Sequence, residues 1–277
     1  MKKSGSRNWV GGGKIVKKSK ELNGDFGVKM WQMWNIPLFG GSKHQVLNII
    51  GEKFALGTKK YWIATVNPEF VMATLKDKKF GQILKQTSLN VVDGVGLVWA
   101  RDVGKGKNWL KAGLEIMMGK NKESLVSGAD LMVDLCKLAS EKGYKVFFLG
   151  GFNNRAEKTM KHFEGLKVEM DFCPGEPEVD NSEVVKKINS FKPDILLVAY
   201  GMKKQEFWIA DNLKDLDVGL VMGVGRSFDY YSGELKRAPK WVRNMGMEWL
   251  YSLLKEPKRI KRQLALPRFV WKVLTKN

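Results

Sequence analysis

The sequence predicts an α/β protein with a Rossmann-like, doubly wound, mostly parallel sheet and a C-terminal basic helical appendage. Strand-like and helix-like runs alternate between residues 28 and 235, which is typical of a parallel sheet covered by helices. The run 195–199 is apolar at every position, as expected of a strand that is buried on both faces. After Ala238-Pro239 the strand signals stop and aromatic residues alternate with basic ones, which favours helices at an interface.

Individual elements are predicted from apolar periodicity and from residues that begin or end helices. Pro68 suits the first turn of a helix, and Asn181 or Ser182 suits an N-cap. The Lys/Gly-rich stretch 104–127 predicts a loop around a short helix. We expect strands at 61–65, 89–92, 145–149, 167–171, 194–200 and 218–222. We expect helices at 68–79, directly after Asp93-Gly94, and at 130–142, 155–163, 182–190, 205–213, 241–256 and 258–274, with Pro257 between the last two and Pro267 breaking or kinking the final one.

Positive charge is concentrated at the two ends of the chain. The formal net charge is +19, of which residues 1–20 carry +7 and residues 236–277 carry +10, leaving +2 for residues 21–235. We therefore expect a flexible basic extension at 1–27, a nearly neutral α/β domain at 28–235 and a basic, amphipathic, membrane-associating appendage at 236–277. Cationic ends of this kind attract anionic lipid surfaces, nucleic acid or phosphate-rich substrates.

Several classes of protein are disfavoured by what the sequence lacks. Cys136 and Cys173 show no metal-ligand spacing and no disulfide framework, which favours a reducing, cytoplasmic compartment. No signal peptide and no apolar run of about 20 residues is present. Asp215-Leu216-Asp217 matches an Asp-x-Asp metal motif but precedes a strand, away from the other candidate residues. A site that is independent of metal and cofactor is therefore expected.

Small or polar residues follow several of the predicted strands. Because the carboxyl ends of parallel strands share one edge of a sheet, these residues are expected to meet around a ligand. Glycines there let backbone N–H groups approach a phosphate, so a nucleotide-like or sugar-phosphate ligand is predicted. Asp93-Gly94 taken alone is equally compatible with a simple turn. The strand ends are Thr65 with Asn67, Asp93-Gly94, Gly150-Gly151, Gly201 and Gly223-Val224-Gly225.

Ordered motifs along the chain carry a family resemblance. The motifs are Thr65-Val66-Asn67-Pro68-Glu69-Phe70, Asp93-Gly94-Val95-Gly96, Ser127-Gly128-Ala129-Asp130-Leu131, Gly201-Met202-Lys203-Lys204-Gln205-Glu206-Phe207-Trp208-Ile209, Met222-Gly223-Val224-Gly225-Arg226-Ser227-Phe228-Asp229, Lys236-Arg237-Ala238-Pro239 and Glu248-Trp249-Leu250-Tyr251. In this order and spacing they resemble the WecG/TagA/CpsF family of bacterial glycosyltransferases over roughly residues 28–277. The resemblance implies an inverting enzyme that moves a sugar, N-acetylmannosamine or a related hexose, from a UDP-sugar to a polyprenyl-pyrophosphate-linked sugar in teichoic acid or surface polysaccharide synthesis.

The resemblance also implies roles for individual residues. Asp93 matches the general base that would take the proton from the acceptor hydroxyl. Arg259 and Arg262 would neutralise a pyrophosphate. The implied partners are the UDP-sugar donor, the polyprenyl-pyrophosphate-sugar acceptor and an anionic membrane surface, to which the protein would bind peripherally on the inner face; homo-oligomerisation is left open. The expected substrate-binding residues are Thr65, Asn67, Gly94, Gln205, Gly223, Gly225, Arg237, Arg259 and Arg262.

Two alternatives remain open at this point. The cationic ends would also suit a nucleic-acid-binding α/β protein, although no nucleic-acid-binding motif is present and no nucleic-acid partner is expected. A catalytically inactive family member acting as a scaffold is the other. It is motivated by Leu125 and Ser252, which stand where many members carry arginine. A third departure from the family is Arg226, which occupies a position that is often small.

Overall fold

The computed structural model describes residues 16–18, 30–176 and 181–275. Most of the predicted extension 1–27 lies outside the described residues. Val16–Lys18 are described and form strand β1, which pairs with β2, so these three residues are not the flexible chain that the composition predicted. Among the described residues, no helix combines the length and the apolar content that crossing a bilayer requires.

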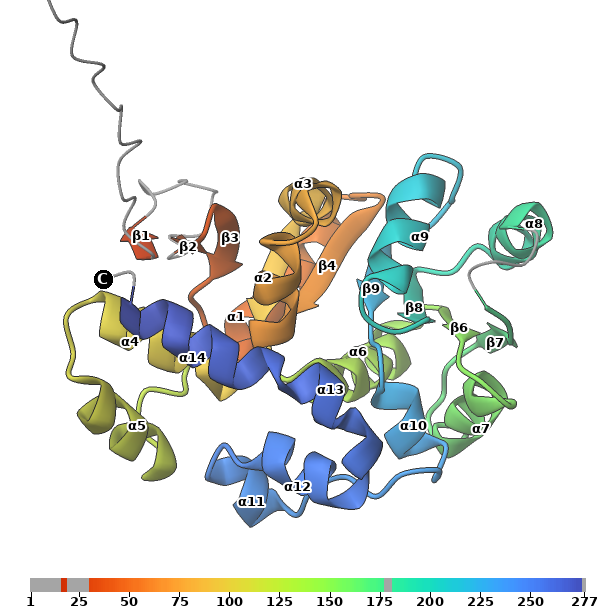
Figure 1. Ribbon diagram of the computed structural model, residues 1–277. Helices are drawn as coiled ribbons and strands as arrows, with labels where there is room; N and C mark the ends of the chain where they lie inside the picture. Colours follow the sequence, from red (N-terminus) through yellow and green to blue (C-terminus); the bar gives the residue numbers. More distant parts are fainter. Residues whose placement is uncertain (1–15, 19–29, 177–180, 276–277) are drawn as a thin grey trace, which may run out of the picture.

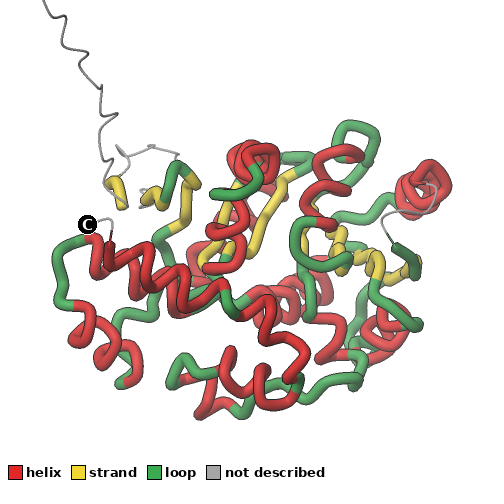
Figure 2. The backbone as a smooth tube through the Cα atoms, in the orientation of Figure 1, coloured by secondary structure: helices red, strands yellow, loops and turns green. Residues whose placement is uncertain are grey.

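The predicted parallel sheet is confirmed. Six strands pair in parallel in the order β5-β4-β9-β8-β6-β7, and helices flank them (Figures 1 and 2). β7 begins three residues later than the predicted strand 167–171. The strands are β4 (Tyr61–Val66), β5 (Leu89–Val92), β6 (Val146–Gly150), β7 (Met170–Cys173), β8 (Ile195–Ala199) and β9 (Leu220–Gly223).

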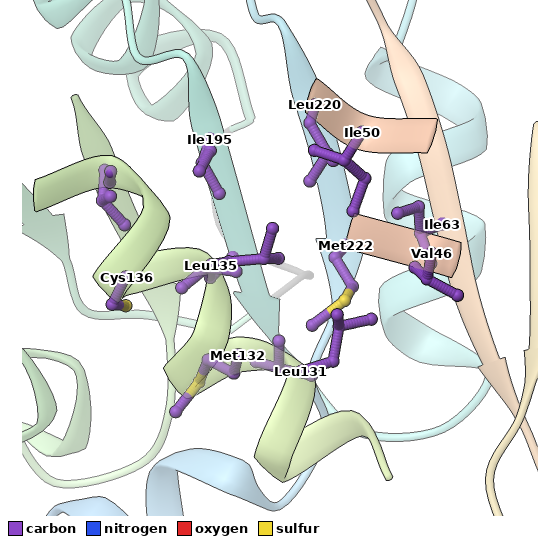
Figure 3. Packing of buried hydrophobic residues seen from close by; sticks show 14 of the residues in the cluster. Val46, Ile50, Ile63, Leu131, Met132, Leu135, Cys136, Ile195, Leu220 and Met222 are labelled. Atoms are coloured by element: carbon purple, nitrogen blue, oxygen red, sulfur yellow. The ribbon is translucent and has the colours of Figure 1, made fainter. Parts of the chain in front are cut away.

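Side chains alternate between the two faces of the sheet, and helices cover both. Along β8, Ile195 and Leu197 enter one apolar cluster, whereas Leu196 and Val198 enter the opposite one, as the period of two in a strand requires. Figure 3 shows side chains of α1 and α6 packed over the first face. That face is covered by α1 (Lys43–Ala55), α6 (Gly128–Lys142) and α7 (Arg155–His162), and the other by α3 (Lys78–Gln86), α8 (Asn181–Phe191) and α9 (Lys204–Asn212).

One predicted helix, 68–79, is wrong. The chain forms α2 (Pro68–Thr74) and then a separate helix α3. Asp77 causes the break, because its side chain accepts a hydrogen bond from the backbone N–H of Phe80 at 3.0 Å and so caps a new helix. Asp77 also pairs with Lys203 at 2.8 Å, which ties this corner to the start of α9.

A small antiparallel sheet was not predicted. β2 (Met30–Met33) and β3 (Ile36–Phe39) form a hairpin whose turn residues, Trp34 and Asn35, both have positive φ. Such two-residue turns normally carry Asn-Gly or Asp-Gly, so Trp34-Asn35 gave no recognisable signal. Trp31, Met33, Ile36 and Leu38 join a cluster with residues of β4 and β5, whereas Phe39 joins the cluster that α1 and α6 cover.

The C-terminal segment consists of several short helices rather than the two long ones expected. Pro267 does not interrupt the last helix: it lies in the first turn of α14, where proline is tolerated, and the break falls at Leu264. The elements after the sheet are α10 (Ser227–Tyr231), α11 (Lys240–Asn244), α12 (Glu248–Lys255), the 3-10 helix η1 (Pro257–Arg259), α13 (Ile260–Gln263) and α14 (Ala265–Thr275).

Helix α14 packs into the body of the protein. It lies along α2 and α4 (Val95–Gly104) (Figure 1), and α4 in turn packs on α5 (Trp109–Met117), the short helix expected within 104–127. Its Phe269 and Val273 are fully buried in the same cluster as Ala64 and Val66 of β4. The C-terminal helices and the sheet therefore share one apolar core.

The burial of Phe269 predicts a large stability cost for its truncation. The ring is 1% exposed and contacts the edge of Trp34, with centroids 5.9 Å apart. Phe269→Ala is expected to lower the free energy of unfolding by about 3–5 kcal/mol, because it removes apolar contacts and leaves a cavity. Urea unfolding monitored by circular dichroism measures this change.

Val270→Ala is the matched control on the same helix, because Val270 is 39% exposed. It should cost less than about 1 kcal/mol. Equal, small effects of both substitutions would show that α14 is not part of the cooperative core.

Candidate active site

A cavity of about 200 Å³ opens at the carboxyl edge of the sheet. It lies where β4 and β9 are neighbours, with β5 on one side and β8, β6 and β7 on the other. Ligands of open α/β sheets bind at such a point. The loops that follow the two neighbouring strands lead away from each other there, and this leaves a crevice at the edge of the sheet. The predicted site residues that line it are Thr65, Asn67, Asp93, Gln205, Gly225, Arg237 and Arg262.

The other three predicted residues lie elsewhere. Gly94 lines an adjacent cavity of about 230 Å³. Gly223 forms the end of β9, and its carbonyl oxygen accepts a hydrogen bond from Thr65 Oγ1 at 3.4 Å. Arg259 belongs to η1, but its side chain lies outside what the structure describes.

Asp93 follows β5 and points its carboxylate toward the N-terminus of α6. Its Oδ2 accepts a hydrogen bond from the backbone N–H of Gly128 at 3.3 Å, and its own N–H donates to the carbonyl of Val66 at 2.8 Å. Residue 128 has to be glycine, because a Cβ there would lie 2.9 Å from Cγ2 of Thr65. The close approach of α6 to β4 therefore brings the N–H within reach of the carboxylate.

Burial raises the pKa of Asp93 to about 7, and the negative charge of Glu248 acts in the same direction. The Gly128 N–H and the Arg237 guanidinium lower it, while Asp130 raises it further. Asp93 is thus a carboxylate that gains and loses a proton near neutral pH. Groups tuned in this way are suited to proton transfer.

Gln205 is held at the end of β9 by a buried network. Its Nε2 donates to Glu206 Oε1 at 2.7 Å, and its Oε1 accepts from the N–H of Gly225 at 3.0 Å. A Cβ at residue 223 would lie 2.4 Å from Nε2 of Gln205, so only glycine leaves room for the amide. Burial raises the pKa of Glu206 to about 7, although hydrogen bonds from Gln205 and from the Lys203 N–H oppose the rise.

Arg237 connects the C-terminal segment to α6. Its guanidinium makes two contacts with Asp130, at 2.5 and 3.1 Å, and donates to Ser127 Oγ at 2.9 Å and to Glu248 Oε1 at 3.2 Å. Its charged centre lies 5.9 Å from the ring centroid of Tyr230. The hydrogen bonds that the guanidinium donates to these carboxylates fix it at the cavity wall.

Two further arginines line the same cavity. Arg262 pairs with Glu69 through Nε and Nη2, at 2.9 and 2.8 Å, which joins α13 to the start of α2. Arg226 binds Asp229 at 3.1 Å and Glu256 at 2.5 Å. Its Nη1 is buried and has no hydrogen-bond partner among the described residues, so one donor of this guanidinium remains unsatisfied within the protein.

Sequence reasoning gave no role to several residues that build this site. Glu206, Asp130 and Glu248 stand beside residues that were assigned roles, inside the motifs quoted above. Their position in those motifs was the available signal. The Asp215-Leu216-Asp217 motif lies away from the cavity, at the amino end of β9, where Asp217 pairs with Lys59 at 3.3 Å.

Comparisons with known proteins place this sequence beside characterised relatives. A model of the Glycosyl transferase WecG/TagA/CpsF family matches residues 31–277. A protein from Staphylococcus aureus (strain MW2) and another from strain NCTC 8325 / PS 47 are each 32% identical over 218 residues, covering 78% of this chain and 80% of theirs. Both relatives are named N-acetylglucosaminyldiphosphoundecaprenol N-acetyl-beta-D-mannosaminyltransferase.

The raised pKa of Asp93 predicts how stability changes with pH. The folded state retains a proton between the ordinary pKa of 3.8 and about 7. The stabilising contribution of the protonated form is therefore present below the ordinary pKa and is lost as pH rises through the folded value. Asp93→Asn, which is always neutral, should gain in melting temperature relative to the wild type as pH rises from 3.8 to about 7, and the difference should stay constant above that range.

Differential scanning calorimetry of both proteins across this range measures the difference. Glu206→Gln is a useful comparison, because Glu206 titrates over the same range but accepts two strong hydrogen bonds that the substitution changes. A melting-temperature difference between Asp93→Asn and wild type that does not vary with pH would contradict the assigned pKa.

Proposed function

The chain belongs to the WecG/TagA/CpsF family of glycosyl transferases, and we propose that it transfers N-acetylmannosamine or a related hexose from a UDP-sugar to a polyprenyl-pyrophosphate-linked sugar. The product would serve teichoic acid or another surface polysaccharide. The names of the Staphylococcus aureus relatives support this acceptor and this sugar. The observation that carries the proposal is the placement of Asp93, a carboxylate with a pKa of about 7, in a cavity lined by three arginines.

Asp93 acts as the general base. The acceptor hydroxyl oxygen attacks the anomeric carbon on the face opposite the leaving group, so the new glycosidic bond forms with inversion. The bond from the anomeric carbon to the phosphate oxygen breaks, and UDP leaves with the electron pair. The hydroxyl proton passes to Asp93, whose pKa matches a base that works near neutral pH.

The arginines of the cavity hold the pyrophosphate of UDP. Arg226 offers a donor that has no protein partner among the described residues, and Arg237 is fixed by carboxylates at the cavity wall. Charge-assisted hydrogen bonds from guanidinium groups stabilise the negative charge that grows on the leaving phosphate. We extend the proposal to a site without a metal cofactor, because these guanidinium groups supply the positive charge.

Replacing the base tests the chemistry. Asp93→Asn removes the proton acceptor but keeps the shape of the side chain, so kcat should fall by about 10²–10⁴-fold. The affinity for UDP should stay close to that of the wild type. Release of UDP from UDP-N-acetylmannosamine, in the presence of a lipid-pyrophosphate-GlcNAc acceptor, measures kcat, and calorimetry measures the affinity.

The pH profile distinguishes a base from a structural carboxylate. Because Asp93 has to be ionised, kcat/KM of the wild type should fall as pH drops through about 7. Glu206→Gln should keep this limb of the profile, since Glu206 only positions Gln205. A fully active Asp93→Asn would refute the assignment, and a wild type that binds UDP yet turns over no UDP-sugar would favour the inactive scaffold.

We also propose that the C-terminal helices hold the cavity against an anionic membrane, on the inner face of the cell membrane. Trp241 and Trp271 are 66% and 71% exposed, and Lys258 and Lys261, which lie between them in the sequence, are also exposed. Exposed aromatic and basic side chains suit the boundary between lipid and water. Each basic residue near an anionic surface contributes about 1 kcal/mol.

Charge reversal tests this binding without removing helices that belong to the core. Lys258→Glu combined with Lys261→Glu should weaken binding to vesicles of phosphatidylglycerol and phosphatidylcholine by about tenfold or more. The matched control is Lys137→Glu with Lys142→Glu, which makes the same charge change on exposed residues of α6. Equal loss in both double variants would argue against a specific membrane face, and tighter binding to duplex DNA at the same salt would favour a nucleic-acid partner.

A further inference from the structure

A second cavity of about 230 Å³ adjoins the first and is also lined by Asp93. We propose that it is the acceptor subsite, which receives the sugar diphosphate of the lipid-linked acceptor; this inference rests on the proposed function. The cavity lies between the start of α4, helix α12 and the start of α14. The wall that it shares with the first cavity consists of Asn67, Glu69, Asp93, Ser127, Tyr230 and Glu248.

An inverting transfer places the base beside the attacking hydroxyl, away from the leaving phosphate. In an inverting transfer, the leaving phosphate and the attacking hydroxyl lie on opposite faces of the anomeric carbon. Arg226, Arg237 and Arg262 line the first cavity and not the second, so the leaving pyrophosphate belongs in the first. The attacking hydroxyl then approaches from the second cavity, which also has Asp93 in its wall.

The lining of the second cavity suits a sugar. Gln263 is buried, its Nε2 donates to the carbonyl of Trp249 at 3.0 Å, and its Oε1 has no partner among the described residues. A sugar hydroxyl or N-acetyl N–H would satisfy this amide, since a buried polar group without a partner is costly. Trp249 adds an aromatic surface and Ser252 adds a hydroxyl group. Binding sites for small molecules typically combine apolar walls with a few polar groups in this way.

The second cavity also contains a cationic side chain that can bind the diphosphate of the acceptor. Arg243 is the one cation among its lining residues. Its Nε donates to the carbonyl of Ala238 at 3.1 Å, while its contact with Asp130 is long, at 3.5 Å. The guanidinium is therefore held in place but retains donors for a phosphate. Leu125 and Leu266 line the same cavity and give the prenyl chain an apolar path outward.

Filling the second cavity tests the assignment. Ser252→Trp places an indole in the acceptor subsite and leaves the first cavity unchanged, because Ser252 lines the second cavity and not the first. Gln263→Leu removes the unpartnered amide and is the second variant. Ser190→Trp is the matched control, because it adds the same indole at an exposed position of α8.

Two readouts separate the subsites. Transfer is measured with UDP-N-acetylmannosamine and varied N-acetylglucosaminyl diphosphate that carries a short, soluble prenyl chain. Binding of UDP is measured by calorimetry, and it also shows that each variant is folded. Ser252→Trp should lower kcat/KM for the acceptor by about tenfold or more, and Gln263→Leu by about tenfold, whereas UDP affinity should change less than about twofold.

Three results would overturn the assignment. Ser252→Trp and Gln263→Leu could bind UDP and transfer sugar as the wild type does, or they could lose UDP affinity and keep the wild-type KM for the acceptor. In both cases the proposed function stands and the subsite is wrong. A wild type that neither transfers to the acceptor analogue nor binds it by calorimetry would refute the proposed function together with the subsite.

Discussion

The site depends on keeping one carboxylate poorly hydrated at the rim of a parallel sheet. Asp93 follows β5 and is approached by α6 because Gly128 packs against Thr65 without a side chain. Burial raises the pKa of the carboxylate, while the N–H of Gly128 donates a hydrogen bond that keeps it in place. An apolar core on both faces of the sheet holds the strand ends rigid, so the carboxylate has a fixed position between two cavities.

Around this carboxylate, each arginine of the first cavity is paired with carboxylates of the protein. Arg237 binds Asp130, Arg226 binds Glu256, and Arg262 binds Glu69. Such pairs cost free energy to desolvate but orient guanidinium groups before a ligand arrives. The pairs also link α6, the end of β9 and the start of α2 to the C-terminal segment. That segment therefore contributes to the site itself, in addition to its exposed aromatic and basic residues.

The sequence predictions succeeded where an element depends on interactions between residues close together in the chain, and failed where it depends on residues far apart or on an unusual local contact. Buried parallel strands such as β8 are apolar at every position, and that signal is local. The break between α2 and α3 was missed because the Asp77 cap competes with a continuous helical pattern. The hairpin of β2 and β3 was missed because its turn uses Trp34-Asn35. Phe269 anchors α14 in a core formed largely by residues nearly 200 positions earlier, which no local pattern reveals.

The sequence by itself determined the fold class and the family resemblance, and most of the site residues that it predicted line the first cavity, because motif residues at strand ends meet wherever the strands are parallel. Only the tertiary structure decided the pKa of Asp93, the pairing of Arg237 with Asp130 and the presence of a second cavity that Gln263 lines. These properties arise from desolvation and from contacts between residues far apart in the chain. Both depend on how elements pack in three dimensions, and neither leaves a periodic signal in the sequence.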